Sequence, residues 1–212
     1  MGHSARVDVG LTGRDRNAGR VIDEFVPAAQ NGNRTSIEID ADPDEVWRAL
    51  NELTFGELRL TSALMAVRSI PALVSRRGEL SRRGAIRPTG RRSRTLVDAM
   101  SSSRFRALHQ DPPRMLVLGI VGQFWKLSGG DDIHIGDADD FKAFDEPGYV
   151  KSAIDFVVEP TATGARLSTE TRNTTTDEVA ARNFGRYWAF VGWGSKLTRK
   201  DMLRAVKRRA ER

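Results

Sequence analysis

Five side chains in the middle and C-terminal parts of the chain are of types that perform acid–base chemistry in enzyme cavities: His109, Tyr149, Asp155, Glu170 and Arg172. Imidazole, phenol and carboxyl groups act as general acids or bases, and a guanidinium stabilises an anion. These residues are spread over three expected strands, so the sequence does not bring them into one site. Glu170 and Arg172 are two apart on one expected strand face, which favours an exposed ion pair. We therefore favour binding over catalysis.

Metal and nucleotide chemistry finds no support in the sequence. The histidines, His3, His109 and His134, show no His-x-x-x-His spacing, and the chain has no cysteine. The run from Asp131 to Glu146 holds seven acidic residues, but it lacks the glycine and glutamate positions of a calcium-binding loop, so we interpret it as a solvated loop. No glycine-rich phosphate-binding pattern is present. We expect no metal and no cofactor.

A basic segment lies in the first half of the chain. Residues 68–94 contain nine arginines and one acid, Glu79, whereas the whole chain has a formal net charge of +6. Such runs are usually solvated, but an Arg-rich insert at 75–94 could also contact an anionic membrane through Arg76, Arg77, Arg82 and Arg83. Between Phe55 and Phe105 there is no aromatic residue on which bases could stack, so nucleic acid is a disfavoured partner. Contact with an anionic membrane or with nucleic acid through the Arg-rich segment is our second alternative function.

Length and composition fit one domain that needs no disulfides. The chain has 212 residues, of which 39% are hydrophobic and 29% charged. The uncharged stretches, among them 60–67 and the longest, 115–125, are all shorter than the roughly 20 residues of a membrane-spanning helix. No apolar leader precedes a cleavage site, so we expect a cytoplasmic protein. We expect a flexible N-terminal arm at 1–33, rich in Gly, Asn, Asp and Arg, and a single domain at 34–212.

The first part of this domain predicts one strand followed by short helices. Residues 35–40 alternate between polar and apolar types, which is typical of a half-buried strand. Asp42 is followed directly by proline and three residues later by glutamate, which predicts a capped helix start. Apolar residues at helical spacing predict a second helix over 58–67, ended by Pro71, and a short helix is expected at 94–101.

From residue 105 onward the pattern indicates strands separated by short turns. Connections of this length join only antiparallel neighbours, so the region predicts a meander. Thr175 and Glu178 predict the capped start of a long C-terminal helix, in which Gly192 and Gly194 predict a kink or a break. The expected strands are 105–110, 115–125, 141–145, 149–158 and 165–174.

The segment from Ile37 to Leu50, IEIDADPDEVWRAL, resembles the opening of the SRPBCC superfamily, which includes START-like proteins, birch-pollen-allergen-like proteins and polyketide cyclases. There a strand runs into an Ala-x-Pro-x-x-Val-Trp helix start, matched here by Ala41, Pro43, Val46 and Trp47. Residues 117–125, 165–188 and 202–211 are also similar to bacterial members that have no assigned reaction. The resemblance implies an α+β helix-grip fold: a curved antiparallel sheet wrapped around a long C-terminal helix, with two short helices after the first strand.

The resemblance also implies a cavity between sheet and C-terminal helix. From the residue types alone a solid core is favoured, and the resemblance reverses that preference. We therefore expect the protein to bind or transport a hydrophobic small molecule or lipid, with a polyketide cyclase-like or dehydratase-like enzyme as the alternative. The residues expected to line the cavity are Leu64, Val67, Leu116, Leu118, Ile120, Ile154, Phe156, Leu167, Phe184, Trp188 and Val191.

Overall fold

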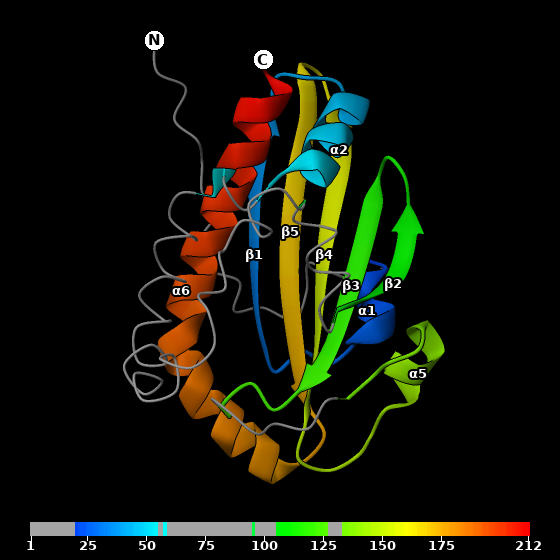
Figure 1. Cartoon of the computed structure of the whole chain (residues 1–212), viewed down its shortest axis with the longest axis vertical. Helices are drawn as coiled ribbons and strands as arrows, with labels where there is room; N and C mark the ends of the chain where they lie inside the picture. Colours follow the sequence, from blue (N-terminus) through cyan, green and yellow to red (C-terminus); the bar gives the residue numbers. More distant parts are fainter. Residues whose placement is uncertain (1–19, 55–56, 59–94, 96–104, 127–132) are drawn as a thin grey trace, which may run out of the picture.

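The computed structural model describes residues 20–54, 57–58, 95, 105–126 and 133–212, and every structural statement below concerns these residues. A curved antiparallel sheet carries helices on both faces, and the C-terminal helix runs along one of them (Figure 1). This confirms the predicted α+β helix-grip arrangement. Apart from Leu58 and Thr95, the helices expected at 58–67 and 94–101 lie outside the described residues.

The sheet has five strands in the order β1-β5-β4-β3-β2, and every neighbouring pair is antiparallel. Strands β2 to β5 are neighbours in chain order, as in a meander, although the strand expected at 141–145 is not among them, and β1 pairs with the far side of β5. Because β5 lies between β1 and β4, it is an inner strand, and eight of its twelve residues are buried. The strands are β1 (Asn31–Ile39), β2 (Arg106–Asp111), β3 (Met115–Gly122), β4 (Val150–Thr161) and β5 (Gly164–Thr175).

One face of the sheet is covered by α6 (Glu178–Ala210) and α2 (Pro43–Glu52). Leu118 of β3 and Phe156 of β4 belong to the same buried apolar cluster as Leu203 of α6. Residues of a strand alternate between faces, so this cluster identifies the side on which α6 lies. None of the described helices is both long enough and apolar enough to cross a bilayer.

The opposite face of the sheet is covered by α1 (Ile22–Phe25) and α5 (Ala138–Ala143). Val117, which alternates with Leu118 along β3, belongs to a second buried cluster together with Phe25 and Phe141. The two aromatic rings meet edge to face, with their centroids 6.4 Å apart. The sheet is therefore buried on both sides, which accounts for the apolar residues on both faces of β3.

The C-terminal half of α6 is fastened to the sheet and to α2 by polar contacts in addition to its apolar stripe. Lys207 Nζ donates to the backbone carbonyl of Glu38 at 2.7 Å. Arg209 bridges Glu52 at 2.7 Å and Glu57 at 3.1 Å. These ion pairs are partly exposed and contribute little individually, but they fix the end of the helix in one position.

Two of the expected helix caps differ from those in the structure. The N-cap of α6 is Asp177, whose Oδ1 accepts from the backbone N–H of Ala180 at 2.6 Å, so the cap expected at Thr175 is wrong. Asp42 occupies the N-cap position of α2 with extended backbone angles, but its side chain makes no capping bond. Aspartate is among the strongest N-cap residues, which explains why α6 begins after Asp177 and not after Thr175.

Of the kink or break expected at Gly192 and Gly194 in α6, the break does not occur. The helix runs through Gly192 and Gly194 without interruption. A Cβ at Gly192 would lie 3.2 Å from Nε1 of Trp188, so this glycine makes room for the indole ring. Each glycine costs about 1 kcal/mol in a helix interior, and packing of the C-terminal half outweighs that cost.

The strand expected at 141–145 is instead the helix α5. Asp137 caps this helix, because its Oδ1 accepts from the backbone N–H groups of Asp139 and Asp140, both at 2.9 Å. Phe141 is fully buried against the sheet and anchors the single turn. Part of the acidic run that was expected to be a solvated loop is therefore the capped start of a helix, where negative charge is stabilised.

The segment from residue 20 to residue 33, which was expected to belong to a flexible arm, is packed in the structure. Ile22, Phe25 and Val26 are at most 5% exposed, and β1 already begins at Asn31. The sequence did not reveal this packing because the apolar residues of the segment form only one turn of helix, which is too short to show a periodicity. The packed part of the described chain thus begins at least fourteen residues before the expected domain boundary at residue 34.

Candidate functional site

The sheet face that lies under α6 changes from apolar to polar along β5. Leu167 belongs to the apolar cluster, whereas the next residues on the same face, Thr169, Thr171 and Asn173, are buried polar groups. The β4 residue directly opposite Thr171 is the half-buried Ile154. We call the buried polar residues of this part of the sheet the polar face: Ser152, Thr169, Thr171 and Asn173.

Arg199 of α6 reaches the polar face and is only 5% exposed. Its Nη1 donates to Oγ1 of Thr171, and its Nη2 donates to Oγ of Ser195 at 2.9 Å. Its Nε is buried and has no hydrogen-bond partner, and the same holds for Oγ1 of Thr169. Within the described ranges, no carboxylate forms an ion pair with this guanidinium, so its polar contacts are two neutral hydroxyl groups.

Burial lowers the pKa of Arg199 to about 10. The buried guanidinium loses hydration, and the carboxylates of Asp155 and Glu170 oppose that effect from the other side of the sheet. With a pKa near 10 the side chain still carries its positive charge at neutral pH. The interior between α6 and the polar face therefore holds a full cation.

The opposite face of the sheet carries a compact group of charged side chains, which we call the ion network: Arg20, Asp23, Asp155, Glu170 and Arg172. Arg20 donates to Asp155 at 2.7 Å and also to Glu170. Arg172 donates from Nε to Glu170 at 2.7 Å and from Nη1 to Asp23. Arg20 and Asp23 belong to the N-terminal segment, so the ion network holds that segment and α1 against the sheet.

Asp155 is the most enclosed member of the ion network, at 1% exposed. Burial raises the pKa of Asp155 to about 6, and the nearby Arg20 partly opposes this. Its Oδ1 accepts from the backbone N–H of Glu170 at 2.7 Å. Both Glu170 and Arg172 are also buried, so the exposed ion pair expected for them is wrong.

The structure thus brings together three of the five acid–base candidates, but these three are bonded to one another. Asp155, Glu170 and Arg172 are covered by the N-terminal segment and lie on the face away from α6. The other two candidates lie apart from this group. His109 is half-buried on β2, and β3 separates it from Asp155. The ring of Tyr149 packs edge to face on the ring of Phe144, with the centroids 5.4 Å apart. The arrangement is that of a structural ion cluster.

The residues predicted to line a cavity fall into two groups, and their ligand-binding role stays a prediction. Leu64 and Val67 lie outside the described residues. Four are buried in the apolar cluster between the sheet, α2 and the C-terminal half of α6: Leu116, Leu118, Phe156 and Leu167. The other five lie on the sheet toward the polar face or on the N-terminal half of α6: Ile120, Ile154, Phe184, Trp188 and Val191.

The N-terminal half of α6 carries an aromatic group around Phe184. This side chain is buried, and its ring lies 5.5 Å from Trp188, 6.0 Å from Tyr187 and 6.3 Å from Phe124, measured between centroids. Trp188 is only half-buried, as is Val191 one turn further along. Among the described residues, Phe184 belongs to neither of the two apolar clusters of the sheet.

Sequence reasoning missed Arg199, although a signal was present. Residues at helical spacings of three and four share one face of a helix. The run Val191, Ser195, Arg199, Met202 and Val206 has spacings of four, four, three and four, which places the arginine within the otherwise apolar stripe. An arginine in a buried stripe is unusual and marks a position at which to look for an anionic partner.

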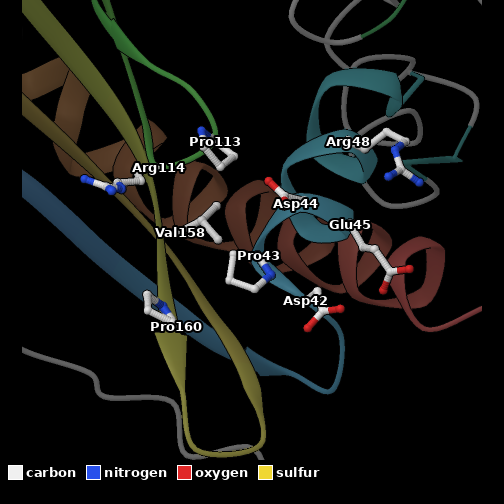
Figure 2. Close-up of a pocket in the computed structure, with 9 residues that line it drawn as sticks. All are labelled: Asp42, Pro43, Asp44, Glu45, Arg48, Pro113, Arg114, Val158 and Pro160. Atoms are coloured by element: carbon white, nitrogen blue, oxygen red, sulfur yellow. The ribbon is translucent and has the colours of Figure 1, made fainter.

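A separate open pocket of about 490 Å³ lies at the end of the sheet where α2 begins (Figure 2). It combines three acidic side chains with two arginines, and its remaining lining is largely proline. It shares no lining residue with the polar face, so it is not the predicted cavity between the sheet and α6. The lining residues are Asp42, Pro43, Asp44, Glu45, Arg48, Pro113, Arg114, Val158 and Pro160.

The structure does not test the expected membrane contact. The Arg-rich insert at 75–94 lies outside the described residues, so contact with an anionic membrane through this insert stays a prediction. Groups of three or more metal-ligating side chains are absent from the part of the chain that the structure describes.

Comparison with known proteins identifies no family. No family model matches the chain, and no curated protein matches it. Among solved structures, the chain is similar to the protein MLL2253 from Mesorhizobium loti, at 16% identity over 84% of this chain and 98% of that one, with a TM-score of 0.34.

Two further solved structures give the same result. CalU16 from Micromonospora echinospora is 17% identical over 85% of this chain and 84% of its own, with a TM-score of 0.31. CV1439 from Chromobacterium violaceum is 13% identical over 84% of this chain and 98% of its own, with a TM-score of 0.32. At such identities and TM-scores the likeness says nothing about function, so the candidate site rests on the geometry of this chain.

Proposed function

We propose that the chain is a member of the SRPBCC superfamily that binds or carries a hydrophobic small molecule or lipid between its sheet and α6, without catalysing a reaction. The support for membership is the helix-grip fold together with the helix start at Ala41, Pro43, Val46 and Trp47, which lies at the N-terminus of α2.

The observation that carries the binding proposal is the incomplete burial of apolar side chains around the polar face. Ile120 and Ile154 on the sheet and Trp188 and Val191 on α6 are half-buried, whereas the apolar residues nearer the C-terminus of α6 are closed off. Trp188 and Val191 lie on the helix stripe that continues to Arg199, and Arg199 contacts the sheet. Apolar side chains left partly open on facing elements favour an apolar ligand.

Among the described residues, no particular observation supports the alternative of a cyclase-like enzyme. Of its candidate acids and bases, Asp155 and Glu170 are engaged in the ion network, and His109 lies elsewhere on the sheet. A group that works as a general base has to reach the proton that it removes. We therefore propose binding alone.

Two measurements test this function. Native mass spectrometry of the freshly purified protein should detect a co-purifying apolar compound, and the neutral dye Nile red should bind saturably with a rise in fluorescence. Trp188→Ala removes a large apolar contact and should weaken dye binding about tenfold, which corresponds to about 1.4 kcal/mol.

The matched control is Trp193→Ala, because this tryptophan lies on the same helix but is 70% exposed. Its substitution should leave the affinity for Nile red unchanged. Absence of any bound compound together with absence of saturable dye binding would refute the proposed function. Equal effects of the two substitutions would place the dye outside the interface between the sheet and α6.

A further inference from the structure

We infer that the ligand is an amphipathic organic acid whose anionic head group is bound by Arg199, with its apolar part directed toward the N-terminal half of α6. This rests on the proposed function and adds a chemical class to it. The first support is the state of Arg199 itself, which is a buried cation whose polar partners are the neutral hydroxyls of Thr171 and Ser195.

Buried charges in proteins are normally paired with an opposite charge. The guanidinium has five N–H donors in a planar fork suited to two oxygens of a carboxylate or phosphate. In Arg199 the Nε–H is buried and makes no hydrogen bond. A further acceptor, carrying negative charge, would complete both the hydrogen bonding and the charge balance of this side chain.

The carboxylates across the sheet do not fill this role. Asp155 and Glu170 lie on the opposite face and are hydrogen-bonded to Arg20 and Arg172. The three acids of the ion network, Asp23, Asp155 and Glu170, are matched in number by Arg20, Arg172 and the neighbouring Arg34, which also acts on Asp155 electrostatically. Arg199 is therefore a cation in excess of the acids around it.

The polar face offers a second unpartnered group beside Arg199. Oγ1 of Thr169 is buried and has no hydrogen-bond partner. Thr169 and Thr171 point to the same side of β5, with two residues of rise, roughly 7 Å, between them. A hydroxyl donates to a carboxylate, so an acidic group held by Arg199 has a second potential donor on the same strand.

The surroundings also fix the direction of the apolar part. Beyond Arg199 toward the C-terminus, Leu203 and Val206 are closed into the apolar cluster and leave no open apolar surface. In the other direction along the same stripe, Val191 and Trp188 are half-buried, and Ile154 is half-buried on the sheet. An acid with its head at Arg199 would therefore extend toward the start of α6.

The test compares two ligands of equal chain length, oleate and oleyl alcohol, in competition with Nile red on the intact protein. At a pH at which the acid is ionised, oleate should bind about tenfold or more tightly than the alcohol, as expected for a charge-assisted hydrogen bond. Arg199→Met should remove this preference while leaving the affinity for the alcohol within a few-fold. Arg186→Met, which removes an exposed arginine of α6, should leave the preference unchanged.

A phosphate head group is distinguished by a third ligand, oleoyl lysophosphatidate. If it competes better than oleate and loses that advantage in Arg199→Met, the acidic head of the natural ligand is a phosphate, which still supports an anion at Arg199. Equal binding of oleate and oleyl alcohol to the native protein overturns the inference but leaves the proposed function intact. Failure of Nile red and all three lipids to bind refutes the proposed function instead. The comparison on the native protein needs no variant, so it holds even if Arg199→Met does not fold.

Discussion

Replacement of Asp155 by asparagine should make the protein more stable at neutral pH. Asparagine keeps the shape of the side chain and an Oδ1 that accepts from the Glu170 backbone N–H, which lies 2.7 Å from the carboxylate in the native protein. It cannot ionise, however, so it removes the buried negative charge. Asp155→Asn therefore isolates the free energy that the protein loses by ionising this group inside the sheet.

The magnitude follows from the pKa of Asp155, which burial raises from 3.8 to about 6. A shift of one pKa unit corresponds to about 1.4 kcal/mol, so the shift is worth about 3 kcal/mol. Because the folded-state pKa lies above the unfolded value, the native state binds the proton more tightly. The contribution of Asp155 is therefore full below about pH 4 and is lost as the pH rises through about 6.

The assay is urea unfolding followed by far-UV circular dichroism, performed on both proteins at each pH. Taking the difference between them cancels the titration of other groups. The variant should match the native protein near pH 4 and exceed its free energy of unfolding by about 3 kcal/mol near pH 8. Glu159→Gln, an exposed change on the same strand, should shift stability by less than about 0.5 kcal/mol. A variant that is less stable than the native protein near pH 8 would show that the pair with Arg20 outweighs burial and would refute this reasoning.

Three further substitutions test the packing and capping with the same unfolding assay. Gly119→Ala should destabilise the protein by about 1–3 kcal/mol, because a Cβ would lie 2.5 Å from Leu108 Cδ1 and 2.9 Å from a ring atom of Phe141. Gly185→Ala should instead stabilise it by about 1 kcal/mol, because nothing lies within 4 Å of a Cβ at this helical position, and a loss of stability would contradict the packing described for α6. Asp177→Ala should cost about 1 kcal/mol through loss of the cap bond to Ala180, and an unchanged midpoint would mean that the cap contributes nothing.

Elements with strong local patterns could be predicted from the sequence. The alternation at 35–40 corresponds to β1, and the short turns after residue 105 predicted the antiparallel pairs β2–β3 and β4–β5. The proline after Asp42 marked the start of α2, even though the expected side-chain cap does not form. In each case the signal lies within about ten residues, which is the range over which periodicity and turn residues act.

The elements that were missed depend on distant partners. The six residues of α5 are too few to show a helical periodicity in the sequence. The helix depends on the cap by Asp137 together with the burial of Phe141 against the sheet. The N-terminal segment looks unstructured because its ordering comes from residues far along the chain, such as Glu170 bound to Arg20. The helical stripe marks Arg199 locally, but its partner could not be predicted, since the contact with Thr171 joins two elements that the sequence alone does not place together.

The position of β1 beside β5 has a consequence for the order in which the nascent chain can fold. Asn31 is opposite Asn173, which follows it by 142 residues, so β1 has no strand partner until most of the chain has left the ribosome. The hairpin of β4 and β5 is local and can form as soon as it emerges. During synthesis, β1 and the N-terminal segment therefore stay without this partner, and exposed to aggregation, until β5 has emerged.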